Sequence, residues 1–243
     1  MTLLATEQLG KTFGGVTAVD GVTFALPKSE VRAIIGPNGA GKSTLVGLIS
    51  GRLAPSAGRI RFDGHDITRL PAWRRVRLGI AYTFQITSVF HHLTCHDNVA
   101  LAVQRATMTG LGRLRTDAPG LRRRCAAVLD RVGLAPALDR PAATLAYGHQ
   151  RLLEVAMGLA LAPKLLIMDE PTQGLADEEI DRACALVREL ARDTTVLLVE
   201  HNMAVVMALA DTITVLDRGR ILAEGPPAAI RADPAVRGAY LGT

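Results

Sequence analysis

Residues 31–44 read VRAIIGPNGAGKST, and this stretch decides the fold class. Its first five residues form a nearly continuous apolar run of strand length, which is typical of a parallel strand covered on both faces. The glycine-rich loop 36–44 follows directly and leads into the helical pattern TLVGLIS. A strand, a GxxxxGK[ST] loop and a helix in this order predict a P-loop, which binds nucleotide phosphates.

Each residue type in this loop has a physical role. Gly36, Gly39 and Gly41 allow the backbone to curl so that its N–H groups point inward at phosphate oxygens, and the following helix adds its positive end. Lys42 supplies a cation to the β- and γ-phosphates, and the Ser43 hydroxyl is a candidate Mg²⁺ ligand. The candidate nucleotide-binding residues of the loop are Gly36, Pro37, Asn38, Gly39, Ala40, Gly41, Lys42, Ser43 and Thr44.

A second apolar strand ends in two carboxylates, in the sequence KLLIMDEP at 164–171. We expect Asp169 to hold Mg²⁺ and Glu170 to polarise a water molecule toward the γ-phosphate. Apolar residues followed by Asp-Glu are weak evidence for such a site when they occur alone. The pattern becomes strong beside a P-loop, because the strand ends of such a sheet lie side by side.

The rest of the chain predicts an α/β fold with additions. TVLLV at 195–199 is a third apolar strand, and helical patterns between the strands indicate a parallel sheet wound by crossover helices. The first thirty residues and 58–64 resemble short strands with glycine-rich turns, and 213–225 resembles a hairpin. We therefore expect a P-loop NTPase core with an N-terminal antiparallel β subdomain.

The middle of the chain is expected to form an α-helical subdomain inserted into this core. Apolar residues from Leu121 to Val132 mark one helix face that ends near Gly133. The predicted organisation is one domain, 1–243, in which 1–87 and 161–243 make the core and 88–160 the helical part.

Composition limits the classes of protein further. The chain has 243 residues, 49% hydrophobic and 21% charged, and its three cysteines form no disulfide framework. We see no signal peptide and no apolar run long enough to span a bilayer. The net charge of +5 permits contact with nucleic acid, but with 4% aromatic residues the basic runs are better explained as solvated helix faces.

The segment LAYGHQR at 145–151 leads into a third helical pattern. A glycine turn at a helix N-terminus is an anion site. Because one phosphate cradle suffices for one nucleotide, we expect Gly148 to face a γ-phosphate held by another subunit.

Taken in chain order, five motifs resemble those of the nucleotide-binding subunits of ABC transporters, over essentially the whole chain: the P-loop, the glutamine of YTFQ, LAYGHQR, the Asp-Glu strand end and the histidine of LLVEH. The resemblance implies Mg²⁺-dependent ATP hydrolysis in which Gln85 contacts Mg²⁺ and the attacking water, and His201 contacts the γ-phosphate and steadies Glu170. It implies that Phe13 stacks on adenine. The signature residues implied to bind nucleotide are Tyr147, Gly148, His149 and Gln150.

Two positions depart from the usual family pattern. Ala146 replaces a serine that would donate to the γ-phosphate, and Ala176 replaces an aspartate, with Asp177 one place late. The form LAYGxQR followed by LEVA, with the C-terminal AYLGT, resembles the subgroup that serves branched-chain amino acid importers. That resemblance implies a transmembrane permease, a second ATPase subunit, an external solute-binding protein, and a peripheral location at the cytoplasmic face of the membrane.

Other functions stay open as alternatives. A lipid or lipopolysaccharide exporter subunit can share this tail, and a DNA-associated ATPase shares the motifs but usually carries long coiled-coil arms. We expect no nucleic-acid partner.

The segment HHLTCH at 91–96 has the residue types of a metal site. No further ligands cluster near it in the sequence, so we expect a partner-contact surface and a helix start, with Thr94 as N-cap and Asp97 three residues on.

Overall fold

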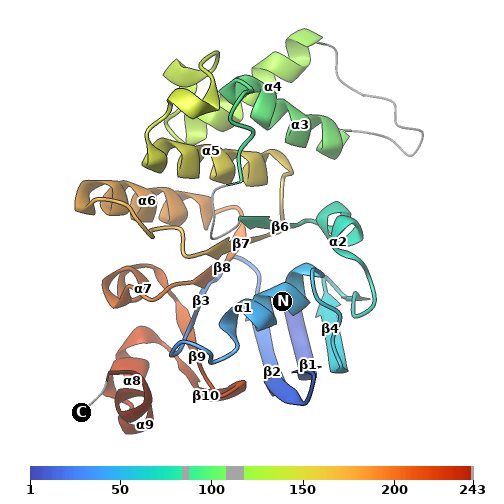
Figure 1. Ribbon diagram of the computed structural model, residues 1–243, viewed down its shortest axis with the longest axis vertical. Helices are drawn as coiled ribbons and strands as arrows, with labels where there is room; N and C mark the ends of the chain where they lie inside the picture. Colours follow the sequence, from blue (N-terminus) through green and yellow to red (C-terminus); the bar gives the residue numbers. More distant parts are fainter. Residues whose placement is uncertain (84–87, 108–117, 242–243) are drawn as a thin grey trace.

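The computed structural model describes residues 1–83, 88–107 and 118–241. Two sheets and three groups of helices lie in layers along the long axis (Figure 1). The main sheet has strand order β10-β9-β3-β8-β7-β6, and only β10 runs antiparallel to its neighbour. Its strands are β3 (Val31–Ile35), β6 (Ile80–Thr83), β7 (Leu165–Asp169), β8 (Thr195–Val199), β9 (Thr212–Asp217) and β10 (Arg220–Gly225).

The three apolar runs are the central strands of this sheet, as predicted. Every residue of β3, β7 and β8 is buried. Along β8, Val196 and Leu198 belong to one hydrophobic core while Leu197 and Val199 belong to another. This alternation follows from the two-residue period of a strand and explains why the runs are mostly apolar, with no alternation of polar and apolar residues.

The second sheet is antiparallel, with order β2-β1-β4-β5. The prediction of several short strands in the first thirty residues was wrong, because the chain forms two strands of twelve residues there. Gly10 and Gly21 lie inside these strands at register shifts, and Gln8 there has φ 46°. The glycines therefore mark bulges rather than turns. The strands are β1 (Thr2–Phe13), β2 (Val16–Pro27), β4 (Ala57–Phe62) and β5 (His65–Asp66).

The predicted hairpin at 213–225 is present, but it belongs to the main sheet. β9 pairs in parallel with β3, so β10 extends that sheet instead of the antiparallel one. A hairpin pattern fixes how two strands pair with each other and leaves their outer neighbour undetermined, so the sequence pattern alone does not assign the hairpin to either sheet.

The helices cover both faces of the main sheet (Figure 1). α1 packs between the main sheet and the antiparallel sheet, whereas α3, α4 and α5 pack on each other above the other face. α7 and α8 enclose a third, smaller core. The helices are α1 (Lys42–Ser50), α2 (Ala72–Leu78), α3 (Cys95–Thr107), α4 (Ala118–Arg131), α5 (Tyr147–Ala160), α6 (Asp177–Leu190), α7 (Met203–Leu209), α8 (Pro227–Ala232) and α9 (Pro234–Val236). Short 3₁₀ turns, η1 (Ala135–Ala137) and η2 (Ala142–Thr144), connect α4 to α5, and a π-helical turn, η3 (Arg237–Leu241), follows α9.

A buried arginine closes the far end of α1. Arg75, 1% exposed, donates to the carbonyl oxygens of Leu48 and Ile49 at 2.7 and 2.9 Å. It also donates to the carbonyls of Leu70 at 2.8 Å and Thr68 at 3.1 Å. Burial lowers the pKa of the Arg75 guanidinium to about 10, so it remains a cation near neutral pH. The helix that begins at the glycine loop is therefore capped at its C-terminal end by a cation from α2.

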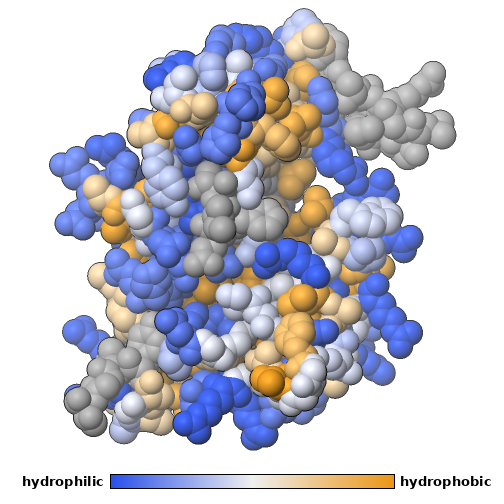
Figure 2. Space-filling view, viewed as in Figure 1, coloured by the Kyte–Doolittle hydropathy of each residue, from blue (hydrophilic) through white to orange (hydrophobic). Residues whose placement is uncertain are grey.

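The described residues contain no helix long and apolar enough to cross a membrane. On the face shown in Figure 2, hydrophilic residues predominate and hydrophobic ones form separate groups, one of them over the α3 and α4 region. The exposed large apolar side chains include Phe13, Trp73, Phe90 and Leu101.

Candidate nucleotide site

The loop between β3 and α1 has the curled backbone that the sequence predicts. Gly36, Gly39 and Gly41 have φ of 150°, 80° and 100°. A β-carbon on Gly36 or Gly41 would collide with the carbonyl oxygen of Leu216 or Ala18, respectively. A β-carbon on Gly39 would meet nothing within 4 Å. Two of the glycines thus fit the loop against the surrounding strands, and the third faces open space that a ligand can enter.

Lys42 folds back over this loop. Its Nζ donates to the carbonyl oxygens of Gly36 at 2.7 Å and Pro37 at 3.0 Å. Burial lowers the pKa of the Lys42 ammonium, and the nearby carboxylates Glu170 and Asp169 oppose that shift. A partly desolvated ammonium is a strong partner for a phosphate oxygen.

The other loop residues surround this arrangement. Ala40 donates its N–H to the Pro37 carbonyl at 3.2 Å and accepts from Gly219 N at 3.0 Å, while Asn38 and Ser43 are exposed and Thr44 is half-buried.

The end of β7 places Asp169 beside a tyrosine that the sequence did not suggest. Asp169 is 5% exposed, and its Oδ2 accepts a hydrogen bond of 2.6 Å from the Tyr82 hydroxyl on β6. Burial raises the pKa of Tyr82, so the phenol keeps its proton and remains a donor. The guanidinium of Arg52 lies 4.0 Å from the Tyr82 ring centroid. The Asp169 carboxylate is therefore held in one orientation by its neighbours.

Glu170 has a backbone conformation that is rare for its residue type. Its φ is 50°, in the left-handed region. Its N–H donates to the Val199 carbonyl at 2.8 Å, and its carbonyl accepts from Arg151 Nη2 at 2.8 Å. Such strain persists only where surrounding contacts enforce it, and it is concentrated at functional sites.

His201 lies beside Glu170. The His201 Nδ1 is 3.8 Å from Glu170 Oε1, and the imidazole is 58% exposed. The two side chains that the sequence predicted to act together are therefore neighbours at the ends of adjacent strands. Glu200, directly before the histidine, was not singled out from the sequence, because a wholly buried polar residue at a strand end has no pattern of its own.

The signature segment lies on the opposite face of the main sheet from α1 (Figure 1). Tyr147 and His149 are exposed at the start of α5, and Gly148 is buried. A β-carbon on Gly148 would collide with the Glu179 carboxylate. The Gln150 amide donates to the Leu145 carbonyl at 3.1 Å and so holds the preceding loop. Within one protomer, the P-loop and the signature segment are not brought together.

The departure at Ala176 has a structural substitute. Ala176 has no side chain that could cap α6, but Glu179 Oε2 accepts the Ala176 N–H at 3.0 Å. This is one half of a capping box. Ala146 stands before α5 in an extended conformation and makes no side-chain cap.

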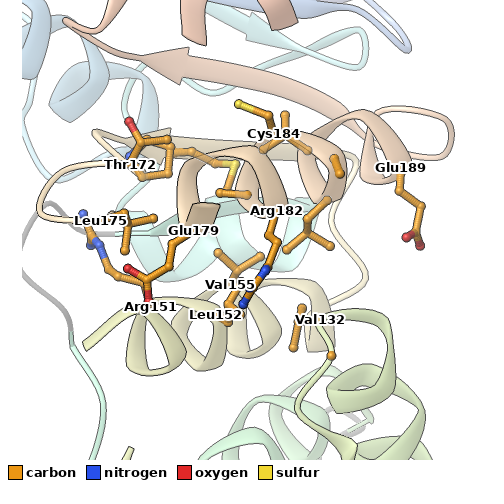
Figure 3. Close-up of a pocket in the computed structure, with 18 of the residues that line it drawn as sticks. Val132, Arg151, Leu152, Val155, Thr172, Leu175, Glu179, Arg182, Cys184 and Glu189 are labelled. Atoms are coloured by element: carbon orange, nitrogen blue, oxygen red, sulfur yellow. The ribbon is translucent and has the colours of Figure 1, made fainter. Parts of the chain in front are cut away.

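A cavity of about 370 Å³ lies between α5 and α6 (Figure 3). Leu152 and Val155 line it from α5 and Cys184 from α6, and Thr172 and Leu175 contribute from the loop after β7. The cavity thus separates the signature helix from the segment that follows Glu170.

Phe13, the residue expected to stack on adenine, is exposed on the hairpin that approaches the P-loop. It is 45% exposed on the β1–β2 hairpin, with Lys11 Nζ 4.9 Å from its ring centroid. On the same hairpin, Ala18 touches the loop at Gly41. The predicted residue Gln85 lies outside the described residues.

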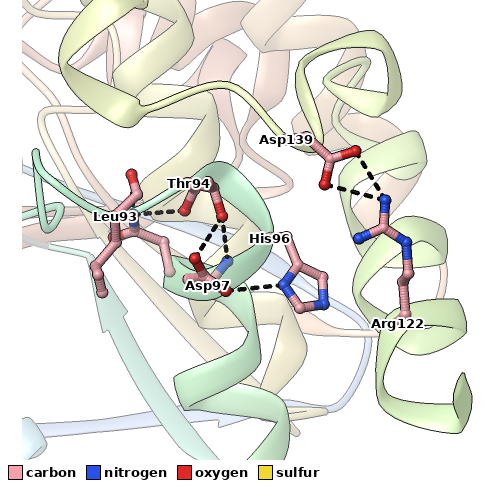
Figure 4. Close-up of polar contacts among 7 residues, drawn as sticks. Leu93, Thr94, His96, Asp97, Arg122 and Asp139 are labelled. Atoms are coloured by element: carbon pink, nitrogen blue, oxygen red, sulfur yellow. Dashed lines mark hydrogen bonds and ion pairs between the residues drawn. The ribbon is translucent and has the colours of Figure 1, made fainter. Parts of the chain in front are cut away.

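The histidine-rich segment starts a helix, as expected. Thr94 Oγ1 accepts the Asp97 N–H at 3.0 Å and donates to its carboxylate at 2.7 Å. His96 Nδ1 lies 3.0 Å from Asp97 Oδ1, with the Arg122–Asp139 ion pair close by (Figure 4). The hydrogen bonds from His96 and Thr94 lower the pKa of Asp97. Over the described ranges, no three His, Cys, Asp or Glu side chains are grouped as metal ligands would be.

Comparison with known proteins identifies this arrangement. Residues 19–173 match the family model described as "ABC transporter". The chain belongs to the ABC transporter ATP-binding family. Members of this ATPase family bind and hydrolyse ATP, and residues 220–243 also match the model "Branched-chain amino acid ATP-binding cassette transporter".

Full-length relatives support the same assignment to the ABC family. The chain is 39% identical over 251 residues to the high-affinity branched-chain amino acid transport ATP-binding proteins BraF of Pseudomonas aeruginosa and LivG of Escherichia coli. Each alignment covers 99% of this chain and 98% of the relative. A nucleotide-free ATP-binding cassette superposes with TM-score 0.89 at 31% identity, and a cassette in an ADP conformation with 0.87 at 31%, both over 100% of each chain.

Proposed function

We propose that this chain is the Mg²⁺-dependent ATPase subunit of an importer for branched-chain amino acids or related small solutes. The family supports ATP hydrolysis, and the names of the relatives BraF and LivG support the substrate class. The observation that carries the catalytic part is the position of Glu170 directly after the end of β7, with its Oε1 3.8 Å from His201 Nδ1.

The donor set at this place suits a magnesium ion. Ser43 offers an exposed hydroxyl at the start of α1, and Asp169 offers a carboxylate fixed by Tyr82. Mg²⁺ prefers such oxygen ligands and keeps several waters. When bound there with ATP, the ion would neutralise charge on the phosphates. Gln85 is the third proposed ligand.

The residues of this chain have separate roles in binding and hydrolysing ATP. The glycine loop and Lys42 bind the β- and γ-phosphates, and Phe13 stacks on the adenine. Glu170, directly after the end of β7, accepts a proton from the attacking water. His201, 3.8 Å away, steadies Glu170 and contacts the γ-phosphate.

We further propose that two ATPase protomers, identical or different, enclose each nucleotide. The P-loop and the signature residues Tyr147, Gly148, His149 and Gln150 lie on opposite faces of the sheet, so one chain offers two half-sites. Residues 88–160 would act as the lobe that carries the signature to the partner's nucleotide, while 1–87 and 161–243 form the core.

The Glu170→Gln variant tests the catalytic assignment. Removing the base should lower ATP turnover at least about 100-fold, the lower range of a general-base effect. Nucleotide binding should persist, and light scattering under saturating Mg·ATP should show a stabilised dimer with a partner ATPase or a second copy. Glu178→Gln, an 88% exposed glutamate on α6, is the matched control and should turn over normally. Monomers under these conditions, or full activity of Glu170→Gln, would contradict the proposal.

The membrane partner is proposed to contact the segment that leads into α3. Phe90 is 54% exposed there, and His91 and His92 are exposed beside it. An exposed aromatic residue with adjacent polar groups is typical of a protein contact. In this position the chain would sit peripherally on the cytoplasmic face of the membrane.

Purification of the tagged chain from solubilised membranes with Mg·ATP tests the partners. A multi-span permease, a second ATPase subunit and indirectly a solute-binding protein would support the importer. A permease with lipid-transport partners would support the exporter alternative. Recovery of nucleic acid without membrane protein would reject the transport role and leave the ATPase chemistry standing.

A further inference from the structure

Glu200 is a wholly buried carboxylate that the proposed reaction does not use directly. It is 0% exposed at the end of β8, between Val199 and His201. Its Oε1 accepts hydrogen bonds from the Thr172 N–H at 3.1 Å and from the Thr172 hydroxyl. Its Oε2 accepts from the N–H groups of His201 at 3.0 Å and Asn202 at 3.2 Å. One side chain thus satisfies four donors.

These bonds join the two loops that carry the reactive side chains. Thr172 lies two residues after Glu170, in the turn that follows β7. His201 lies directly after Glu200, and the side chain of Asn202 caps α7 by accepting the Ala204 N–H at 3.0 Å. A separate backbone bond runs from Glu170 N to Val199 O at 2.8 Å. The segment 170–172 is therefore held against 199–202 at several points, and Glu200 supplies the side-chain part.

The geometry of the reactive pair depends on this connection. Glu170 Oε1 and His201 Nδ1 are separated by 3.8 Å, a distance longer than an optimal hydrogen bond. Because the His201 imidazole is 58% exposed, its distance from Glu170 depends on the position of the loop that carries it. A small displacement of either loop would change it, and misplacement by about 1 Å can cost a reaction 100-fold.

We propose that Glu200 is a positioning residue for ATP hydrolysis. Through its hydrogen bonds to Thr172 and to the His201 backbone, it holds the Glu170 carboxylate and the His201 imidazole at their observed separation. This inference rests on the proposed function. It predicts that Glu200 affects the chemical step and leaves the binding of ATP by the P-loop nearly unchanged, since no contact of Glu200 reaches the described residues of that loop.

Substitution by an amide isolates the hydrogen bonds from the side-chain volume. In Glu200→Gln, one carboxylate oxygen becomes an NH₂ group, which cannot accept a hydrogen bond. This group must face either the Thr172 donors or the backbone N–H groups of His201 and Asn202. We expect kcat for ATP, measured on the full chain with its co-purifying membrane partners, to fall roughly 10- to 100-fold. The KM for ATP should stay within about twofold. Glu178→Gln is again the matched control.

Thr172 provides a second pair of variants for the case in which Glu200→Gln folds poorly. Thr172→Val removes the hydroxyl and should lower kcat in the same direction with an unchanged KM. Thr172→Ser keeps the hydroxyl and should restore most of the activity.

A His201→Ala background distinguishes a positioning role of Glu200 from a general effect of Glu200 on protein stability. If Glu200 acts by aligning His201 with Glu170, Glu200→Gln should reduce kcat much less in a His201→Ala chain than in the original one. Equal fold losses in both backgrounds, an unchanged kcat for Glu200→Gln, or no difference between Thr172→Val and Thr172→Ser would overturn the inference. Absence of ATP hydrolysis by the unmodified chain with its partners would instead reject the proposed function itself.

Discussion

The P-loop and the ends of β7 and β8 are both turns that follow buried parallel strands, yet they are built from different chemistry. The P-loop uses backbone N–H groups, glycine conformations and one mobile cation. The β7 and β8 ends use side chains, and each reactive group has a supporting residue: the half-buried Tyr82 for Asp169, and the buried Glu200 for the pair Glu170 and His201. Binding phosphate requires many donors in a shell, whereas activating water requires one group at one place.

The largest expected effect concerns Lys42, the one charged residue of the P-loop. Lys42→Ala removes the ammonium that folds over the loop. A hydrogen bond to a charged group contributes about 1.5–3 kcal/mol, so ATP affinity should fall by roughly 10- to 100-fold in a fluorescence titration. Lys28→Ala, which removes a surface ion pair with Asp63, is the control. Unchanged affinity would mean that the backbone alone forms the phosphate site. The P-loop would then differ even more from the ends of β7 and β8, which use side chains.

A smaller effect is expected from the glycines themselves. Alanine at Gly39 brings only the strain of a positive φ, which costs about 1 kcal/mol of unfolding free energy. Alanine at Gly41 adds a collision with the Ala18 carbonyl, so its loss should be at least about twice as large. Denaturant unfolding of the two variants without nucleotide measures the difference. Equal losses would show that the hairpin can move away from the loop.

The smallest effect is a proton linkage at Lys42. Its pKa in the folded protein lies below the ordinary 10.5, so the folded chain binds fewer protons than the unfolded chain as pH rises through that lowered pKa toward 10.5. Stability from this group therefore increases with pH across that alkaline window. A bound polyanion raises the pKa of Lys42, so ATP binding in this window should take up a fraction of a proton.

Calorimetry in two buffers of different ionisation enthalpy detects this uptake. It should disappear in Lys42→Ala, and uptake that persists in that variant would assign the linkage to another group.

The two regions also differ in how well they could be predicted from the sequence. The P-loop has a fixed spacing of glycines and a lysine, and the predicted curled backbone was found, with positive φ at Gly36, Gly39 and Gly41. Glu170 was predicted from the carboxylates at a strand end and His201 through resemblance, and the two side chains lie together. Tyr82, Thr172 and Glu200 were missed because their roles depend on contacts between separate strands, which no local pattern encodes. The predicted strand lengths of the antiparallel sheet were wrong for a related reason, since a glycine bulge and a glycine turn resemble each other in sequence.

Arg75 has a consequence for the electric field in the nucleotide site. α1 has nine residues, a length of about 13 Å, so its two ends are close enough to influence each other through a weakly polar interior. An uncapped C-terminus would direct partial negative charge toward any anion at the other end. With the Arg75 guanidinium on the Leu48 and Ile49 carbonyls, that opposing potential is cancelled. The positive potential at the phosphate end of α1 is therefore less opposed by the other end of the helix. Arg75 of α2 thus favours anion binding although it lies at the opposite end of α1.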